Sequence, residues 1–193
     1  MADGGWRLAP VVWLALTWCA VAAPAPDEPR IVIVVNVVDS DDSLSAVRVP
    51  AQLIAGGIYE QAGITVVWVD ELTPPPSALT LMVVPSASSP AHLAAEAMGV
   101  APSPGDGTRG STAYVFSDRV TSFAESGQLH LASVLACAMA HEIGHLLLPA
   151  GAHTHDGIMR GSWSPYLFPP RVAGVPGFTP SQAQLLRLRA ASR

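Results

Sequence analysis

The sequence predicts a mixed α/β domain built on a mostly parallel sheet, and three observations lead to this fold class. Residues 31–38 form an almost uninterrupted run of apolar, mostly β-branched residues of strand length. A helical pattern over residues 44–61 and a second strand pattern over residues 64–69 follow it, and this order implies a parallel pair with a right-handed crossover. Residues 128–148 carry almost no charge, which predicts a mostly buried helix.

The first strand, residues 31–38, is apolar on both of its faces, as expected for a strand that is covered on both sides. A polar turn leads from it into the helix at residues 44–61, where two adjacent glycines weaken the helical pattern and Gly63 ends it. We expect this helix to bury four apolar side chains: Val47, Leu53, Ile54 and Ile58.

The remaining elements follow in chain order. After a proline-rich break, residues 79–84 form a third strand, and residues 91–98 are a candidate for a short alanine-rich helix. Residues 111–117 form a fourth strand, whose mixed composition suits the edge of a sheet. Beyond the long buried helix, Thr179 as N-cap and Pro180 at the first helical position begin a C-terminal helix. Three leucines of that helix are expected to pack: Leu185, Leu186 and Leu188.

Composition excludes several classes of protein. The chain has 193 residues, of which 50% are hydrophobic and 13% charged, and its formal net charge is −5. A mildly acidic chain without a basic cluster is a poor partner for nucleic acid or for an anionic membrane surface. Its apolar content argues against disorder, and a single apolar run of near-spanning length argues against a polytopic membrane protein. We therefore expect one globular domain over residues 31–193, without nucleic acid as a partner, and a monomer.

The N-terminus resembles a secretory signal peptide. Arg7 precedes an uncharged apolar run that ends in small residues near position 23, the pattern of an export signal with its cleavage site. We therefore predict a signal peptide over residues 1–23, a proline-broken lead-in over residues 24–30, and a secreted or extracytoplasmic protein without membrane contact beyond the signal. An uncleaved anchor helix is the alternative. Cleavage would remove Cys19 and leave Cys137 without a partner for an internal disulfide.

The motif that carries chemistry is His-Glu-x-x-His at residues 141–145, inside the long buried helix. Residues four apart lie on the same helical face, so His141 and His145 can reach one metal ion. Zinc favours nitrogen ligands, and a catalytic zinc site keeps one position open for water. Glu142 can reach that water without binding the metal, which makes it the candidate general base.

A third ligand must come from further along the chain. No glutamate follows Glu142, and the nearby downstream candidates are His153, His155 and Asp156. Pro149 ends the helix, and the glycine two residues later permits a sharp reversal that can return the chain to the metal. We favour His153 as the third ligand and keep His155, and after it Asp156, as alternatives.

These residues resemble the zinc site of the zincin metallopeptidases, and specifically the metzincin branch with its matrixin-like members. The stretch from His141 to His145 matches the family motif, with His153 as a third histidine at an extended spacing, and Gly157 to Met159 resembles the family's Met-turn beneath the metal. The resemblance implies a twisted sheet with an antiparallel edge strand, here residues 111–117, above the substrate cleft.

The resemblance also implies a function. We expect a zinc-dependent metalloendopeptidase that binds Zn²⁺ and hydrolyses peptide bonds by Glu142-assisted attack of a zinc-bound water. Some family members place a transition-state tyrosine two residues after the Met, where this chain has Gly161, and Tyr166 is a weak substitute. Arg160 is a candidate oxyanion partner, with an ordinary surface arginine as the alternative. The alternatives are a non-catalytic zinc-containing binding or structural module on the same fold, and a zinc hydrolase that acts on a non-peptide bond.

Overall fold

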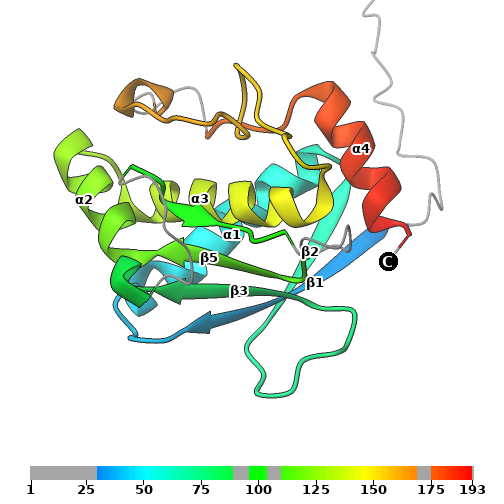
Figure 1. Ribbon diagram of the computed structural model, residues 1–193, viewed down its shortest axis with the longest axis horizontal. Coiled ribbons are helices and arrows are strands. Elements are labelled where there is room, and N and C mark those ends of the chain that lie inside the picture. The colour runs from blue at the N-terminus through cyan, green and yellow to red at the C-terminus, as the bar shows by residue number, and fades with distance from the viewer. Residues whose placement is uncertain (1–29, 89–95, 104–109, 169–174, 193) are drawn as a thin grey trace, which may run out of the picture.

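The computed structural model describes residues 30–88, 96–103, 110–168 and 175–192, and it confirms the mixed α/β fold class. Figure 1 shows a twisted sheet with helices packed against it and a long loop that passes over helix α3 before the C-terminal helix. The predicted signal peptide and all of the lead-in except Arg30 lie outside the described residues. Both therefore stay predictions.

The sheet has five strands in the order β2-β1-β3-β5-β4. They are β1 (Ile31–Asp39), β2 (Ile64–Val69), β3 (Leu79–Val84), β4 (Gly99–Val100) and β5 (Thr112–Phe116). The expected parallel pairing of the first two strands is confirmed, and β1–β3 and β3–β5 are parallel too. Only the β4–β5 pair is antiparallel, so the sheet is mostly parallel with an antiparallel edge.

The prediction that residues 111–117 form the edge strand is wrong. β5 pairs with β3 on one side and with β4 on the other, so it lies inside the sheet, and β4 is the antiparallel edge. A two-residue strand such as β4 has no periodicity of its own and is defined only by its pairing with β5. The mixed composition of β5 has another cause, because Thr112 and Tyr114 lie half-buried on the face that no described helix covers.

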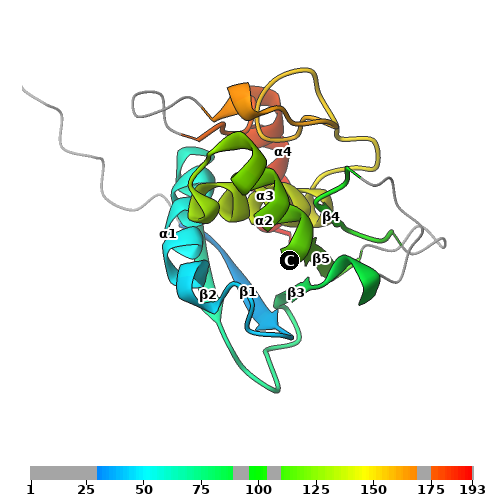
Figure 2. The ribbon, with the colours of Figure 1, turned by 90° about the vertical axis from the view of Figure 1, so that its left-hand side faces the viewer.

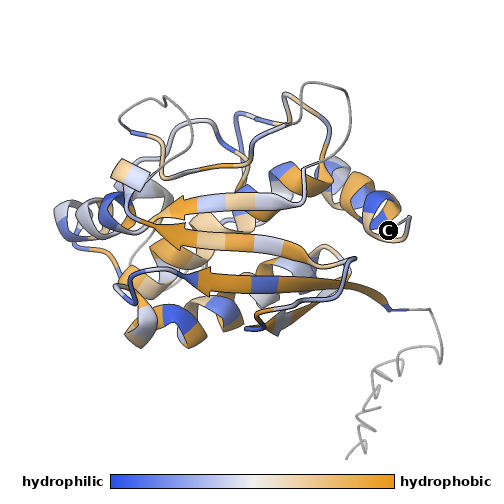
Figure 3. Cartoon of the chain, turned by 60° about the horizontal axis from the view of Figure 1, so that its bottom comes forward, coloured by the Kyte–Doolittle hydropathy of each residue, from blue (hydrophilic) through white to orange (hydrophobic). Residues whose placement is uncertain are grey.

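The two faces of the sheet differ. Helices α1 (Ser45–Gln61) and α3 (Leu131–Leu147) pack on one face, as Figure 2 shows, and the side chains of β1 that point to them are buried. On the opposite face Val32 is 48% exposed and Val67 43% exposed, although Figure 3 shows these strands to be largely hydrophobic. The expectation that the first strand is covered on both sides is therefore wrong at Val32, whereas Asn36 on the same face is 3% exposed.

Helix α1 buries a different set of side chains from the one expected. Ile58 is buried, but Val47 and Ile54 are only half-buried and Leu53 is 73% exposed. The helix instead packs closely on α3 through small side chains, supported by a fully buried tyrosine. Its buried residues are Ala51, Ala55, Ile58 and Tyr59.

The long segment expected as one helix at 128–148 becomes α3, almost all of it buried. An additional helix that the sequence analysis missed, α2 (Ser117–Gly127), follows β5 directly and packs against α3. Gln128 separates the two helices in a left-handed conformation with φ of 52°. Because of this break, α3 begins three residues later than expected.

The C-terminal helix α4 (Pro180–Ala190) begins as predicted, with Thr179 as its N-cap and Pro180 at its first position. Of its three leucines only Leu186 is buried, while Leu185 and Leu188 are 40% and 64% exposed. α4 packs against α3 and β1.

The helix expected at 91–98 falls largely outside the described residues, and its last three residues, 96–98, are not helical. Among the described residues, no helix has the length and apolar character needed to cross a bilayer.

Candidate metal centre

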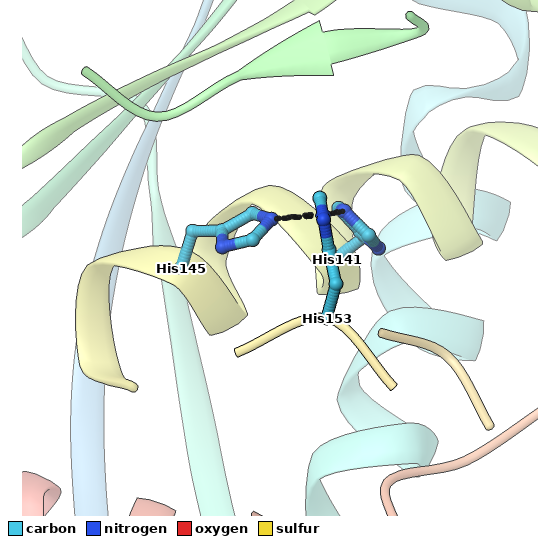
Figure 4. Close-up of side chains that lie close together, drawn as sticks. All are labelled: His141, His145 and His153. Atoms are coloured by element: carbon cyan, nitrogen blue, oxygen red, sulfur yellow. Dashed lines mark hydrogen bonds between the residues drawn. The ribbon is translucent and has the colours of Figure 1, made fainter. Parts of the chain in front are cut away.

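Three histidine side chains lie close together, two from α3 and one from the loop that follows it. His141 and His145 lie one turn apart on α3 and therefore share one face of the helix. The chain leaves the helix at Leu148 and reverses at Gly151, where φ is +75°, as the proline and glycine of this segment predicted. This reversal brings His153 back over the helix, and Figure 4 shows its ring beside the rings of the other two histidines.

The Nε2 atoms of these three rings form a small triangle. Nε2 of His145 lies 3.0 Å from Nε2 of His141 and 3.0 Å from Nε2 of His153, and the third side measures 3.3 Å. Zinc bonds of about 2.0–2.1 Å at tetrahedral angles place ligand nitrogens about 3.3 Å apart. The triangle therefore fits three of the four positions around a tetrahedral metal ion.

The structure separates the candidates for the third ligand. Within the described part of the chain, His141, His145 and His153 form the group of potential ligands close enough to share a metal ion. The alternatives, His155 and Asp156, pair with each other at 3.1 Å, and their side chains are 90% and 82% exposed. Of the downstream candidates, the fold thus places only His153 beside the helical pair.

Burial keeps the helical pair in the form that a metal requires. Burial lowers the pKa of His141 to about 4, with a contribution from His153, although the bond to Ile158 opposes the shift. Burial, and next His141 and His153, lower the pKa of His145 to about 3. Nδ1 of His141 lies 2.8 Å from the backbone oxygen of Ile158, so a neutral ring donates there and leaves Nε2 free to bind metal.

Glu142 lies beside this triangle in an apolar slot. It is 5% exposed, its Oε2 has no hydrogen-bond partner among the described residues, and burial raises its pKa to about 8. A β-carbon built on Gly99 of the edge strand would lie 2.6 Å from Cγ of Glu142, 2.7 Å from its Oε1 and 2.5 Å from the backbone oxygen of Tyr114. Only glycine lets the edge strand and this carboxyl group approach so closely, a role that the sequence analysis missed.

The segment expected as a Met-turn passes beneath the histidines. Gly157 has φ of +77°, and Ile158 donates from its backbone nitrogen to the backbone oxygen of Gly177 at 2.8 Å. Met159 is fully buried, and a β-carbon on Gly144 would lie 2.7 Å from its sulfur. Met159 thus packs against α3 at Gly144, which lies between His141 and His145 in the sequence.

The histidines and Glu142 line a cleft with a volume of about 790 Å³. Its walls are the edge strand β4 with the residues before it, helix α2, helix α3 and the loop at 160–163. The wall formed by α2 includes Arg119 and Phe123, and it was not predicted because helix α2 was not predicted. Its signal in the sequence is the helical spacing of Val120, Phe123 and Ala124.

Aromatic side chains connect α2 to the metal site. The ring of Trp163 stands edge-on to His141 at 5.6 Å and to Phe168 at 5.8 Å, and Phe168 in turn lies 5.9 Å from Phe123. Trp163 and Phe168 therefore pack the long loop, and Trp163 also borders the cleft.

The position where some metzincins have a tyrosine is occupied by Gly161, beside the ring of His153. A β-carbon there would lie only 3.3 Å from Nδ1 of His153. Tyr166 is 93% exposed and is not among the residues of the cleft, whereas Arg160 is half-buried and lines it. Cys137 is fully buried one turn before His141 and does not belong to the group of potential ligands.

No protein-family model matches the chain, and no curated protein shows significant similarity to it. Its function is therefore inferred from the geometry of the site and from the His-Glu-x-x-His motif.

Proposed function

We propose that the protein is a secreted zinc-dependent metalloendopeptidase of the metzincin type. One observation carries the proposal: three histidine Nε2 atoms lie within 3.3 Å of one another beside the buried carboxyl group of Glu142, on the wall of a cleft. A metal held by three protein ligands keeps a position open, which distinguishes catalytic from structural zinc sites.

His141, His145 and His153 would hold the metal. An all-nitrogen set of neutral imidazoles suits zinc among the common divalent ions. When bound, zinc supplies a Lewis acid that polarises a peptide carbonyl and lowers the pKa of a water molecule at the open position.

Glu142 would act as general base and then as general acid. Burial raises the pKa of Glu142 to about 8 in the metal-free protein, which makes its carboxylate a stronger base. The ionised carboxylate would take a proton from the attacking water, and the resulting carboxyl group would deliver it to the leaving amine. The neighbouring strand β4 is at the end of the sheet order, so its outer side can pair with an extended peptide.

The metzincin type is supported by the turn at Met159 and by the order of the elements. A strand, a helix and further strands precede the histidine helix, and the turn and a C-terminal helix follow it. Helix α2, inserted between the sheet and the histidine helix, departs from the expected order.

Secretion is supported by the apolar segment that follows Arg7. Mass spectrometry of the exported protein is expected to find a new N-terminus near residue 23. An intact Met1 on exported protein would contradict cleavage.

Substitution of Glu142 tests the peptidase. Glu142→Gln and Glu142→Ala are expected to lower peptide hydrolysis by more than about 100-fold, as loss of a general base does, while the protein still binds zinc. His155→Ala is the matched control, because its exposed ring lies outside the triangle.

The same measurements separate the alternatives. Zinc bound by a wild-type protein that cleaves nothing in an unbiased peptide mixture would favour a non-catalytic module. Hydrolysis of esters or amides without cleavage of peptides would favour a non-peptide hydrolase.

A further inference from the structure

Gln182, in the first turn of α4, connects that helix to the loop that carries His153. It is only 5% exposed. Its Oε1 accepts a hydrogen bond from the backbone nitrogen of Thr179 at 3.0 Å, and Oγ1 of Thr179 accepts one from the backbone nitrogen of Gln182 at 3.3 Å. These two bonds form the capping box that begins α4.

The other end of the same amide group reaches the loop. Nε2 of Gln182 donates to the backbone oxygen of Ala152 at 3.2 Å and to Oγ1 of Thr154 at 3.1 Å. These are the residues immediately before and after His153. One side chain therefore uses its oxygen to cap a helix and both of its N–H groups to hold the chain on either side of the third histidine.

We propose that Gln182 is a positioning residue that fixes His153 in the metal centre through Ala152 and Thr154. The inference rests on the proposed metal centre, but it does not depend on the peptidase activity. Gln182 would act by reducing the conformational freedom that the loop loses when His153 binds a metal ion.

Among the described residues, the backbone beside His153 makes few other hydrogen bonds, although Ala152 is half-buried and packs against the core. The imidazole is exposed, and its hydrogen-bond contacts are with the rings of His141 and His145. On the C-terminal side, Thr154 donates from its backbone nitrogen to the backbone oxygen of Met159 at 2.9 Å and forms a β-bridge with Arg160. On the N-terminal side, a β-carbon on Gly151 would meet no atom within 4 Å. Gln182 adds a hydrogen bond to the backbone oxygen of Ala152 on this N-terminal side of His153. It does so from helix α4, which the buried Leu186 anchors in the core.

Glutamine, rather than glutamate, is required for this double role. A capping box accepts either residue, because both offer an oxygen to the N-cap backbone. An ionised glutamate has no N–H group for Ala152 or Thr154, and the hydroxyl of Thr154 already donates to the backbone oxygen of Asp156 at 2.7 Å. The capping role and the positioning role can therefore be separated by substitution.

The test compares three variants of the full chain at pH 8. Gln182→Glu keeps the cap and loses both donors, Gln182→Met loses cap and donors at similar size, and Thr179→Ala weakens the cap but keeps both donors. Zinc affinity is measured by competition with a chelator. We expect both Gln182 variants to bind zinc about 10–100-fold more weakly, the range for partners that orient metal ligands.

Thr179→Ala is expected to bind zinc within about twofold of the wild type and to lower the melting temperature by roughly 2–4 °C, as loss of a helix cap does. Wild-type zinc affinity in both Gln182 variants, or an equal loss in Thr179→Ala, would overturn the proposal.

Hydrogen exchange of the metal-free proteins gives a readout that needs neither zinc nor activity. The segment 152–154 is expected to exchange faster in both Gln182 variants than in the wild type or in Thr179→Ala. Unchanged exchange in this segment would contradict the positioning role, even for a protein that cleaves no peptide.

Discussion

The candidate metal centre has two halves that are held in place by different forces. The half on α3, with His141 and Glu142, is 9% and 5% exposed and belongs to the core. The buried hydroxyl of Tyr59 even donates to the backbone oxygen of Ala140, one residue before the first ligand, at 3.0 Å. The half on the loop, with His153, is exposed and is held by a few polar contacts, among them those of Gln182.

This difference separates folding from metal binding. Packing fixes the helical half in the metal-free protein, because interiors are dense and tolerate little movement. The loop half is held by hydrogen bonds, and a bound metal ion would order it further. Substitutions on the helix should therefore change stability and metal affinity together, whereas substitutions on the loop should change metal affinity alone.

The largest expected effect is the loss of a ligand. His141→Ala and His153→Ala should each weaken zinc binding by more than about 100-fold, which is the upper end of the range for residues that only orient ligands. Only His141→Ala should also lower the stability of the metal-free protein. His153 is exposed, and substitutions of exposed residues change stability by no more than about 0.5 kcal/mol. Zinc affinity and thermal unfolding of both variants check this.

His155→Ala is the matched control on the loop and should change neither quantity. Loss of zinc in His155→Ala with full binding in His153→Ala would reverse the ligand assignment.

The pH dependence of the metal-free protein probes the helical half. Between about pH 4.5 and 6.5 the unfolded chain protonates His141 and His145, which stay neutral when folded, while the folded chain protonates Glu142. The unfolded state then binds one proton more, so stability should rise by about 1.4 kcal/mol per pH unit. From pH 6.5 to about 8 only folded Glu142 holds the extra proton, so stability should fall.

Thermal unfolding of the metal-free protein from pH 5 to 8 should therefore show the highest stability near pH 6.5, because of the titration of His141, His145 and Glu142. Glu142→Gln should abolish the decline on the alkaline side. An unchanged decline in this variant would show that another group causes it.

Gly99→Ala tests the contact between the edge strand and the helical half. The added methyl group overlaps Glu142 and the backbone of Tyr114, so we expect a loss of about 1–3 kcal/mol of stability, as for other overpacked sites. Because the overlap with Glu142 disappears in Glu142→Ala but not in Glu142→Gln, the loss should be smaller in the alanine background alone. Equal losses in both backgrounds would contradict the contact.

The smallest expected effect lies far from the site. A β-carbon at Gly57 of α1 meets nothing within 4 Å, so Gly57→Ala should stabilise the protein by roughly 0.5–1 kcal/mol through helix propensity. Thermal unfolding measures the change, and zinc affinity should not move. A loss of stability here would show that α1 is less regular than its backbone indicates.

Much of this arrangement could be predicted where a local pattern carries the information. The strand run at 31–38, the buried helix around the His-Glu-x-x-His motif and the Thr179-Pro180 helix start all depend on neighbours in sequence. Predictions were wrong where burial depends on packing between distant elements. Leu53 and Leu188 have helical spacing with their buried neighbours, yet both are exposed, because no other described element covers them.

From the sequence we could predict that His141 and His145 share one helical face and that Glu142, the candidate base, lies between them, because residues four apart in an α-helix lie one turn apart. The fold was needed to show that His153 rather than His155 lies beside this pair, that the two-residue strand β4 forms the edge of the sheet, and that Gln182 bonds to the loop on either side of His153. These features depend on contacts between residues distant along the chain, for which local sequence periodicity carries no signal.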